Sequence, residues 1–69
     1  MKLSARNVLR GTIRKIEYGT VNAEITLEIA PGVQVVSIIT TNSVERLDLF
    51  VDKTAYAVIK ASGVMVATD

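Results

Sequence analysis

A nine-residue stretch, VNAEITLEI at positions 21–29, constrains the fold more than any other part of the chain. Apolar residues occupy every odd position of this stretch and polar residues occupy every even one. Strict period-two alternation over this length predicts a half-buried β-strand, with one face on a core and the other in solvent. The chain is therefore expected to be built around a β-sheet.

The segments on either side of this strand predict further strands joined by tight turns. The apolar positions upstream, Leu9, Ile13 and Ile16, change phase once, and Gly11 lies inside the same run, which predicts a bulged or bent first strand. We expect a hairpin turn at Tyr18–Thr20 and a type II turn at Ala30–Val33, whose central pair is Pro-Gly. The run Val33–Thr40 is apolar on both faces, which predicts a strand covered by its own barrel and by another subunit.

The second half of the chain predicts one helix and two more strands. Apolar residues recur at helical spacing over Thr41–Phe50, with Thr41 or Asn42 as the expected N-cap. Two strands are predicted after it, at Thr54–Ala61 and Val64–Ala67. The order β-β-β-α-β-β predicts a mainly β fold, a small OB-like five-stranded barrel with one short helix after the third strand.

Composition limits the chemistry that such a barrel can perform. The 69 residues include no Cys and no His, so the common general base and the common metal ligands are missing, and we expect neither an enzyme nor a metal site. A net charge of +1 and 4% aromatic residues argue against a nucleic-acid partner. An apolar content of 49% is more than one small core can bury, which predicts homo-oligomer interfaces.

The sequence also carries expectations about where the protein works. No apolar run approaches the roughly 20 residues of a membrane helix, and the first residues lack the apolar core of a secretory signal. We therefore expect a cytoplasmic protein with no membrane partner.

Three short polar clusters fall at expected strand ends: SARN at 4–7, TTNS at 40–43 and KASG at 60–63. They supply hydroxyls, one guanidinium and one ammonium, and no acid. A set of donors without a carboxylate suits an oxyanion. Each cluster also has a structural interpretation, as a turn, a helix cap and an edge-strand lysine. Residue types alone leave both interpretations open.

Four segments in this order, SARNVLRGTI, GTVNAEI, SIITTNSVERLDL and AVIKASGVMVA, make the chain resemble the molbindins, small molybdate-binding proteins made of one Mop domain. The resemblance covers essentially residues 1–69 and implies one Mop domain. It implies an OB-like barrel that dimerises by exchanging strands, with three dimers forming a homo-hexamer. Molybdate or tungstate would bind between subunits, for intracellular storage or homeostasis.

By matching position, the resemblance also assigns the oxyanion-binding residues. These are Ser4, Ala5, Arg6, Thr40, Ser43, Lys60, Ala61 and Ser62. Arg6 and Lys60 would supply the charge, while Thr40 and Ser43 would face the ion from a neighbouring chain. A second class of site is implied at Thr20, Val21 and Asn22. Two alternatives stay open, an OB-type nucleic-acid-binding module and a purely structural assembly module.

Overall fold

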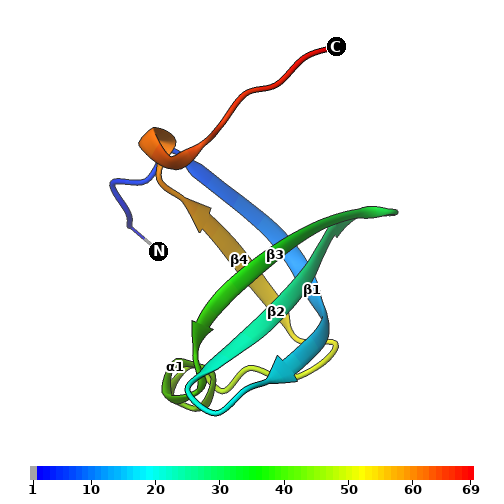
Figure 1. The fold of residues 1–69 in the computed structure, drawn as a ribbon, viewed down its shortest axis with the longest axis vertical. Coiled ribbons are helices and arrows are strands. Elements are labelled where there is room, and N and C mark those ends of the chain that lie inside the picture. The colour runs from blue at the N-terminus through cyan, green and yellow to red at the C-terminus, as the bar shows by residue number, and fades with distance from the viewer. Residues whose placement is uncertain (1) are drawn as a thin grey trace.

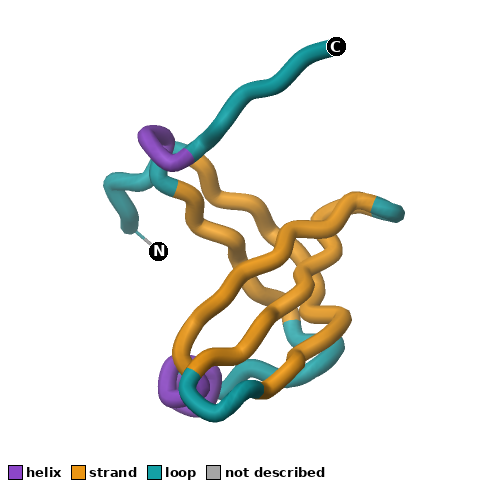
Figure 2. Tube along the Cα trace, in the orientation of Figure 1, coloured by secondary structure: helices purple, strands orange, loops and turns teal. Residues whose placement is uncertain are grey.

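Four antiparallel strands curl into a half-barrel in the computed structural model, which describes residues 2–69 (Figure 1). The elements are β1 (Asn7–Tyr18), β2 (Asn22–Ala30), β3 (Val33–Thr40), α1 (Thr41–Arg46), β4 (Thr54–Ile59) and the 3₁₀ turn η1 (Ala61–Gly63). The sheet order is β3-β2-β1-β4. The pair β1–β4 crosses the pair β2–β3 in Figure 2, with α1 at one end of the sheet and η1 at the other.

The predicted irregularity of the first strand is confirmed, because β1 bends at a β-bulge. Its pairing with β2 skips one residue between Ile13 and Lys15, which makes Arg14 the bulged residue. The first half of β1 pairs with β4 and the second half pairs with β2. At Gly11 the Glu28 carbonyl oxygen lies 2.8 Å from the place that a Cβ would occupy, so β1 and β2 approach closely there only because the residue is glycine.

The alternation in β2 supplies most of the core. Its inward residues are Ala23, Ile25 and Leu27, which are buried together with Ile13 and Val44. The strand begins at Asn22, one residue later than predicted, and Val21 is exposed. The Val21 carbonyl instead accepts the backbone N–H of Thr41 at 2.9 Å and so joins the β1–β2 turn to the start of α1.

The type II turn and the strand after it follow the sequence prediction. Gly32 has φ +76°, the left-handed value that the third residue of this turn requires. β3 spans the predicted Val33–Thr40, and its inward residues alternate with outward ones. The outward Val36 and Ile38 are exposed on the single chain, so the predicted cover over this second face is not part of one chain.

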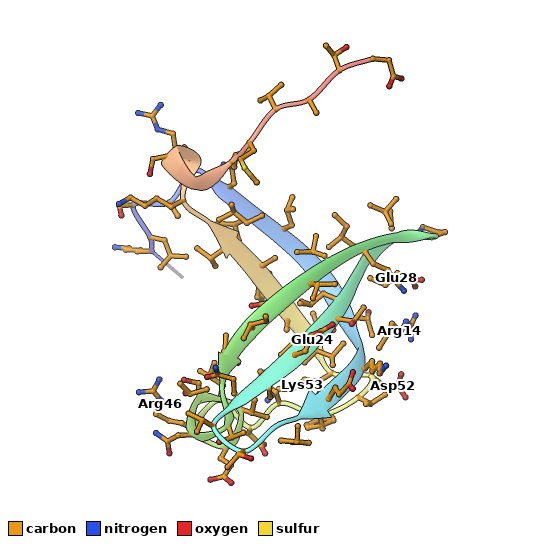
Figure 3. The ribbon with its side chains drawn as sticks, viewed as in Figure 1. Arg14, Glu24, Glu28, Arg46, Asp52 and Lys53 are labelled. Atoms are coloured by element: carbon orange, nitrogen blue, oxygen red, sulfur yellow. The ribbon has the colours of Figure 1, made fainter. Side chains whose placement is uncertain are left out.

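Helix α1 is shorter than predicted and begins with a different cap. It ends at Arg46, because the backbone turns left-handed at Asp48 (φ 53°). The N-cap is Thr40, in place of the expected Thr41 or Asn42. Lys53, labelled in Figure 3, closes the far end: its Nζ donates to the carbonyls of Leu47 at 3.2 Å and Asp48 at 2.7 Å.

The predicted five-stranded barrel is present only in part in the single chain, which forms a four-stranded half-barrel. β4 ends at Ile59, η1 turns the chain away from the sheet, and residues 64–69 pair with no strand among the described residues. A strand needs a neighbour with free backbone groups, and Figure 1 shows this tail leading away from the sheet. Met65 and Val66 are 94% and 93% exposed as a result.

Candidate functional site

Six of the eight predicted oxyanion-binding residues line one pocket, at the end of the sheet where β1 begins. The pocket has a volume of about 520 Å³, and its lining comprises Ser4, Ala5, Arg6, Lys60, Ala61 and Ser62, with Leu3 and Val58. No acidic residue is part of this lining. Two clusters separated by more than 50 residues of sequence are therefore adjacent in space.

The pairing of β1 with β4 explains why these clusters meet. Asn7 stands opposite Ile59 at the last cross-strand pair of the two strands. Arg6 immediately precedes this pair on one strand and Lys60 immediately follows it on the other, so both leave the sheet at the same end and line the same pocket. η1 then turns the chain, so that Ala61 and Ser62 line the pocket and do not continue the strand.

The charges of this pocket are not balanced in the isolated chain. Arg6 and Lys60, both exposed, are the charged residues of its lining. The ion pairs among residues 2–69 lie elsewhere, at Arg14–Glu28 (3.1 Å), Arg14–Asp52 (3.3 Å) and Lys15–Glu17 (3.4 Å). Figure 3 shows Arg14 with Glu28 and Asp52 beside the bend of β1. Arg6 and Lys60 thus form a cationic pair without an acidic partner in this part of the chain.

The other two predicted residues, Thr40 and Ser43, lie at the opposite end of the sheet. Thr40 pairs with Asn22 across β2 and β3, and both lie beside the turn that follows β1. The twelve residues of β1 separate this end from the pocket, roughly 35 Å of extended strand before its bend is counted. One chain therefore cannot bring Thr40 and Ser43 to its own Arg6 and Lys60.

Thr40 and Ser43 do lie next to the residues predicted for a second site. The Thr41 hydroxyl donates to the Val21 carbonyl at 3.2 Å, which places the start of α1 beside Thr20–Asn22. The structure thus groups the predicted residues into two sets, one at each end of the sheet.

Sequence reasoning missed two residues of the pocket, Leu3 and Val58. The strand period offered a signal for Val58, because a residue two positions from Lys60 on a strand points to the same face. Leu3 precedes β1 and had no comparable signal.

Two properties of the described residues bear on other kinds of site. Between residues 2 and 69, no helix has the length and apolar character needed to cross a membrane. In the same range, no three acidic side chains gather closely enough to hold a metal ion.

Comparison with known proteins identifies the family. The TOBE domain model matches residues 3–66. A probable molybdenum-pterin-binding protein of Haemophilus influenzae is 45% identical over the full length of both chains. A molybdate-binding protein of Sporomusa ovata has the same fold, with a TM-score of 0.92 and 38% identity over 99% of this chain and 100% of its own.

A third relative was solved with its ligand. The cytoplasmic molybdate-binding protein ModG, in a form with molybdate bound, has a TM-score of 0.89 and is 48% identical over 94% of this chain and 46% of its own. These relatives are named for binding, which agrees with the prediction of a protein that is not an enzyme. The chain belongs to the TOBE domain family, and within it to the molybdenum-pterin-binding proteins called molbindins.

Proposed function

We propose that the chain, acting as one Mop domain over residues 1–69, binds molybdate or tungstate reversibly in the pocket between the start of β1 and η1. The observation that carries this proposal is the lining of the pocket, which contains two cations, Arg6 and Lys60, and no acid. An oxyanion with two negative charges balances them. The protein then serves as a store or buffer of the ion in the cytoplasm.

The donors of the pocket suit a tetrahedral oxyanion. Ser4 offers a hydroxyl and Ala5 a backbone N–H from the segment before β1, while Ala61 and Ser62 open η1. Hydrogen bonds in which one partner is charged are about twice as strong as neutral ones. The oxyanion is charged, so this holds for every donor of the pocket. Arg6 and Lys60 add the attraction between opposite charges and so contribute most to binding, while the neutral donors fix the orientation of the ion.

A neighbouring chain completes the site with Thr40 and Ser43. The Ser43 backbone N–H donates to Thr40 Oγ1 at 3.1 Å, and the Thr40 hydroxyl donates to Ser43 Oγ at 2.8 Å. This chain of bonds uses the Thr40 proton and leaves the Ser43 hydroxyl proton free to donate to an ion. Hydrogen bonds in series polarise one another, which makes Ser43 a better donor.

Two features of the single chain, an apolar groove and an exposed apolar tail, support an assembly of several copies. The half-barrel has an apolar groove of about 700 Å³ between β3 and β4, and residues 64–69 carry exposed apolar side chains with no partner strand in the described chain. We assign the groove to the tail of a second copy, which gives a strand-exchanged dimer. Three dimers then form the hexamer in which neighbouring chains share each site, so ligand stabilises the assembly by mass action.

A second class of site lies at Thr20, Val21 and Asn22. These residues adjoin the start of α1, but the Val21 carbonyl is already bonded to Thr41. Backbone N–H groups and the Asn22 amide are the donors left for an ion there. This end of the sheet has no cation in the cluster, so we expect it to bind more weakly than the Arg6–Lys60 pocket.

From the lining of the pocket we also predict which anions bind weakly or not at all. At neutral pH, phosphate carries a proton for part of the time and needs an acceptor for it, and the pocket lining has no carboxylate. Sulfate satisfies the same donors but is smaller, so it leaves part of the cradle unfilled.

Titration calorimetry tests this function with molybdate, tungstate, sulfate and phosphate in one series. We expect saturable heat with the first two anions and weak or no heat with the others. Light-scattering mass before and after the titration reports whether the oligomer is present. An oligomer that gives no heat with molybdate or tungstate contradicts the proposal.

A further inference from the structure

An outward face of the β1–β4 pair combines apolar and cationic side chains. Alternate residues of a strand share one face, and so do their cross-strand partners. On this face Val8 stands opposite Val58, and Arg10 stands opposite Tyr56. All four are exposed, and we call them the cationic face. Among residues 2–69, Arg10 forms no ion pair.

An outward face of the β2–β3 pair combines apolar side chains with an acid. Glu24 stands opposite Ile38, and Thr26 stands opposite Val36. We call these four residues the acidic face. Ile38 is 68% exposed and Val36 is 57% exposed, so two large apolar side chains lie next to each other on this exposed face.

Glu24 lacks a compensating charge in the single chain. Its neighbour across β1 is Glu17, a second acid, and Glu17 pairs with Lys15 at 3.4 Å. Within residues 2–69 the Glu24 carboxylate takes part in no ion pair. Figure 3 shows Glu24 on β2, apart from the Arg14–Glu28–Asp52 group. Arg10 and Glu24 are therefore two opposite charges on two different faces, each without a partner.

The proposed shared site, with Thr40 of one copy beside Arg6 and Lys60 of the next, sets the alignment of the two faces. Arg6 and Lys60 lie two residues along the chain from Val8 and Val58, just past the Asn7–Ile59 pair that ends the ladder, so the cationic face leads toward them. The acidic face continues to the Asn22–Thr40 pair, two residues along each strand from Glu24 and Ile38. Successive pairs on one face are roughly 7 Å apart in both sheets.

An assembly that sets Thr40 of one copy at Arg6 and Lys60 of the next would place Ile38 against the apolar pair Val8–Val58, because the spacing on the two faces is the same. Glu24 stands beside Ile38 on the neighbouring strand. Arg10 is the next residue on the same face as Val8, two positions along β1, so its long side chain would be within reach of that acid.

We propose that the cationic face of one copy packs on the acidic face of the next, with Ile38 against Val8 and Val58 and with Arg10 paired to Glu24. This inference rests on the proposed function, because the shared site sets the alignment. The two faces differ, so the contact is head-to-tail, and contacts of this kind close into a ring when the rotation permits. Complementary charge selects the partner and fixes the register of such a contact.

Charge reversal tests the Arg10–Glu24 pair on the full-length protein. Arg10→Glu and Glu24→Arg are each expected to reduce the light-scattering mass from that of six chains to that of two. The double variant Arg10→Glu/Glu24→Arg is expected to recover the wild-type mass, because the pair is restored with its signs exchanged. Arg46→Glu is the matched control: Arg46 ends α1, forms no ion pair within residues 2–69 and is expected to leave the mass unchanged.

The outcomes separate this inference from the function on which it rests. Single variants that keep the wild-type mass overturn it, and so does a double variant that stays dissociated while circular dichroism shows the native fold. A wild-type chain that is monomeric at every concentration also overturns it. Wild-type protein that assembles but binds no molybdate contradicts the proposed function and leaves the reversal experiment valid as a test of the contact.

Discussion

Thr40 and Ser43 hold each other at the start of α1, because the Ser43 backbone N–H donates to Thr40 Oγ1 at 3.1 Å while the Thr40 hydroxyl donates to Ser43 Oγ at 2.8 Å. The Thr40 side chain thus caps the helix, and the side chains of Thr40 and Ser43 form the proposed second wall of the anion site. A helix cap needs a hydrogen-bond acceptor, whereas a bound oxyanion needs donors. Substitutions at Thr40 can therefore separate capping from binding.

Thr40→Ala removes the N-cap and is expected to lower the free energy of unfolding by about 1 kcal/mol. Thr40→Asp retains a good cap and is expected to cost much less. The new carboxylate would face the bound oxyanion, however, so Thr40→Asp should abolish molybdate binding. Thermal unfolding and calorimetry on both variants check this pair of results. Normal molybdate affinity in folded, assembled Thr40→Asp would rule out Thr40 as a wall of the site.

Neutralising Arg6 or Lys60 is expected to lower the affinity for molybdate and to raise the stability of the ligand-free protein. Arg6→Gln and Lys60→Met should each weaken molybdate binding by roughly tenfold to a hundredfold, the loss of charged hydrogen bonds worth about 1.5–3 kcal/mol. Each should also raise the ligand-free Tm slightly, because two like charges no longer share one pocket without an acid. Calorimetry and thermal scans at low salt measure the two effects. A lower ligand-free Tm in both variants would show that the pair is not repulsive.

Lys53 closes the C-terminal end of α1 by donating to the carbonyls of Leu47 and Asp48. Its Nζ also lies 5.2 Å from the centre of the Phe50 ring. Lys53→Met keeps the apolar stem and loses both bonds, for an expected cost of about 1–3 kcal/mol. Lys15→Met is the control: its surface ion pair with Glu17 is worth about 0–1 kcal/mol. Urea titration compares them, and equal midpoints would contradict a structural role for Lys53.

Gly11 allows the close approach of β1 and β2. A Cβ at Gly11 would lie 2.8 Å from the Glu28 carbonyl oxygen and 3.1 Å from Ile29 Cγ2, so Gly11→Ala is expected to cost about 1–3 kcal/mol. At Gly63 a Cβ meets nothing within 4 Å, which makes Gly63→Ala the matched control. Thermal unfolding should show a clear loss of Tm for the first variant only.

Much of the fold could be predicted from the sequence, because the period-two pattern records which face of a strand is buried. The alternation in VNAEITLEI located the core positions Ala23, Ile25 and Leu27, and the Pro-Gly pair located the type II turn. The end of α1 could not be predicted in this way. Residues 47–50 are apolar enough to continue the helix, but Asp48 turns left-handed and Lys53 caps the freed carbonyls.

The fifth strand shows a different limit of sequence reasoning. VMVA at 64–67 has strand-forming residues, yet the propensity of a segment does not reveal whether its partner is in the same chain. The candidate site shows the same limit. Residue types indicated three donor clusters, and the β1–β4 register brings two of them together. The third lies at the far end of the same sheet, and residue types give no sign of that separation.

Deletion of residues 64–69 tests the proposed strand exchange. The truncated chain retains all four strands and the core, but its apolar groove has no tail to fill it. We expect loss of the dimer, with a light-scattering mass of one chain and a lower Tm. Addition of the free tail peptide should recover part of the lost Tm. A truncated chain that keeps the wild-type mass would place the dimer contact elsewhere.

The most direct test of the shared site is a crystal structure of the protein grown with tungstate, with data collected at the tungsten absorption edge. The anomalous difference map is predicted to show a peak within hydrogen-bonding distance of Arg6 and Lys60 of one chain and of Ser43 of another. A peak at this place, lost in crystals of Arg6→Gln, would establish the site. A well-ordered assembly whose tungstate lies away from Arg6 and Lys60, or whose pocket is reached by no second chain, would contradict it.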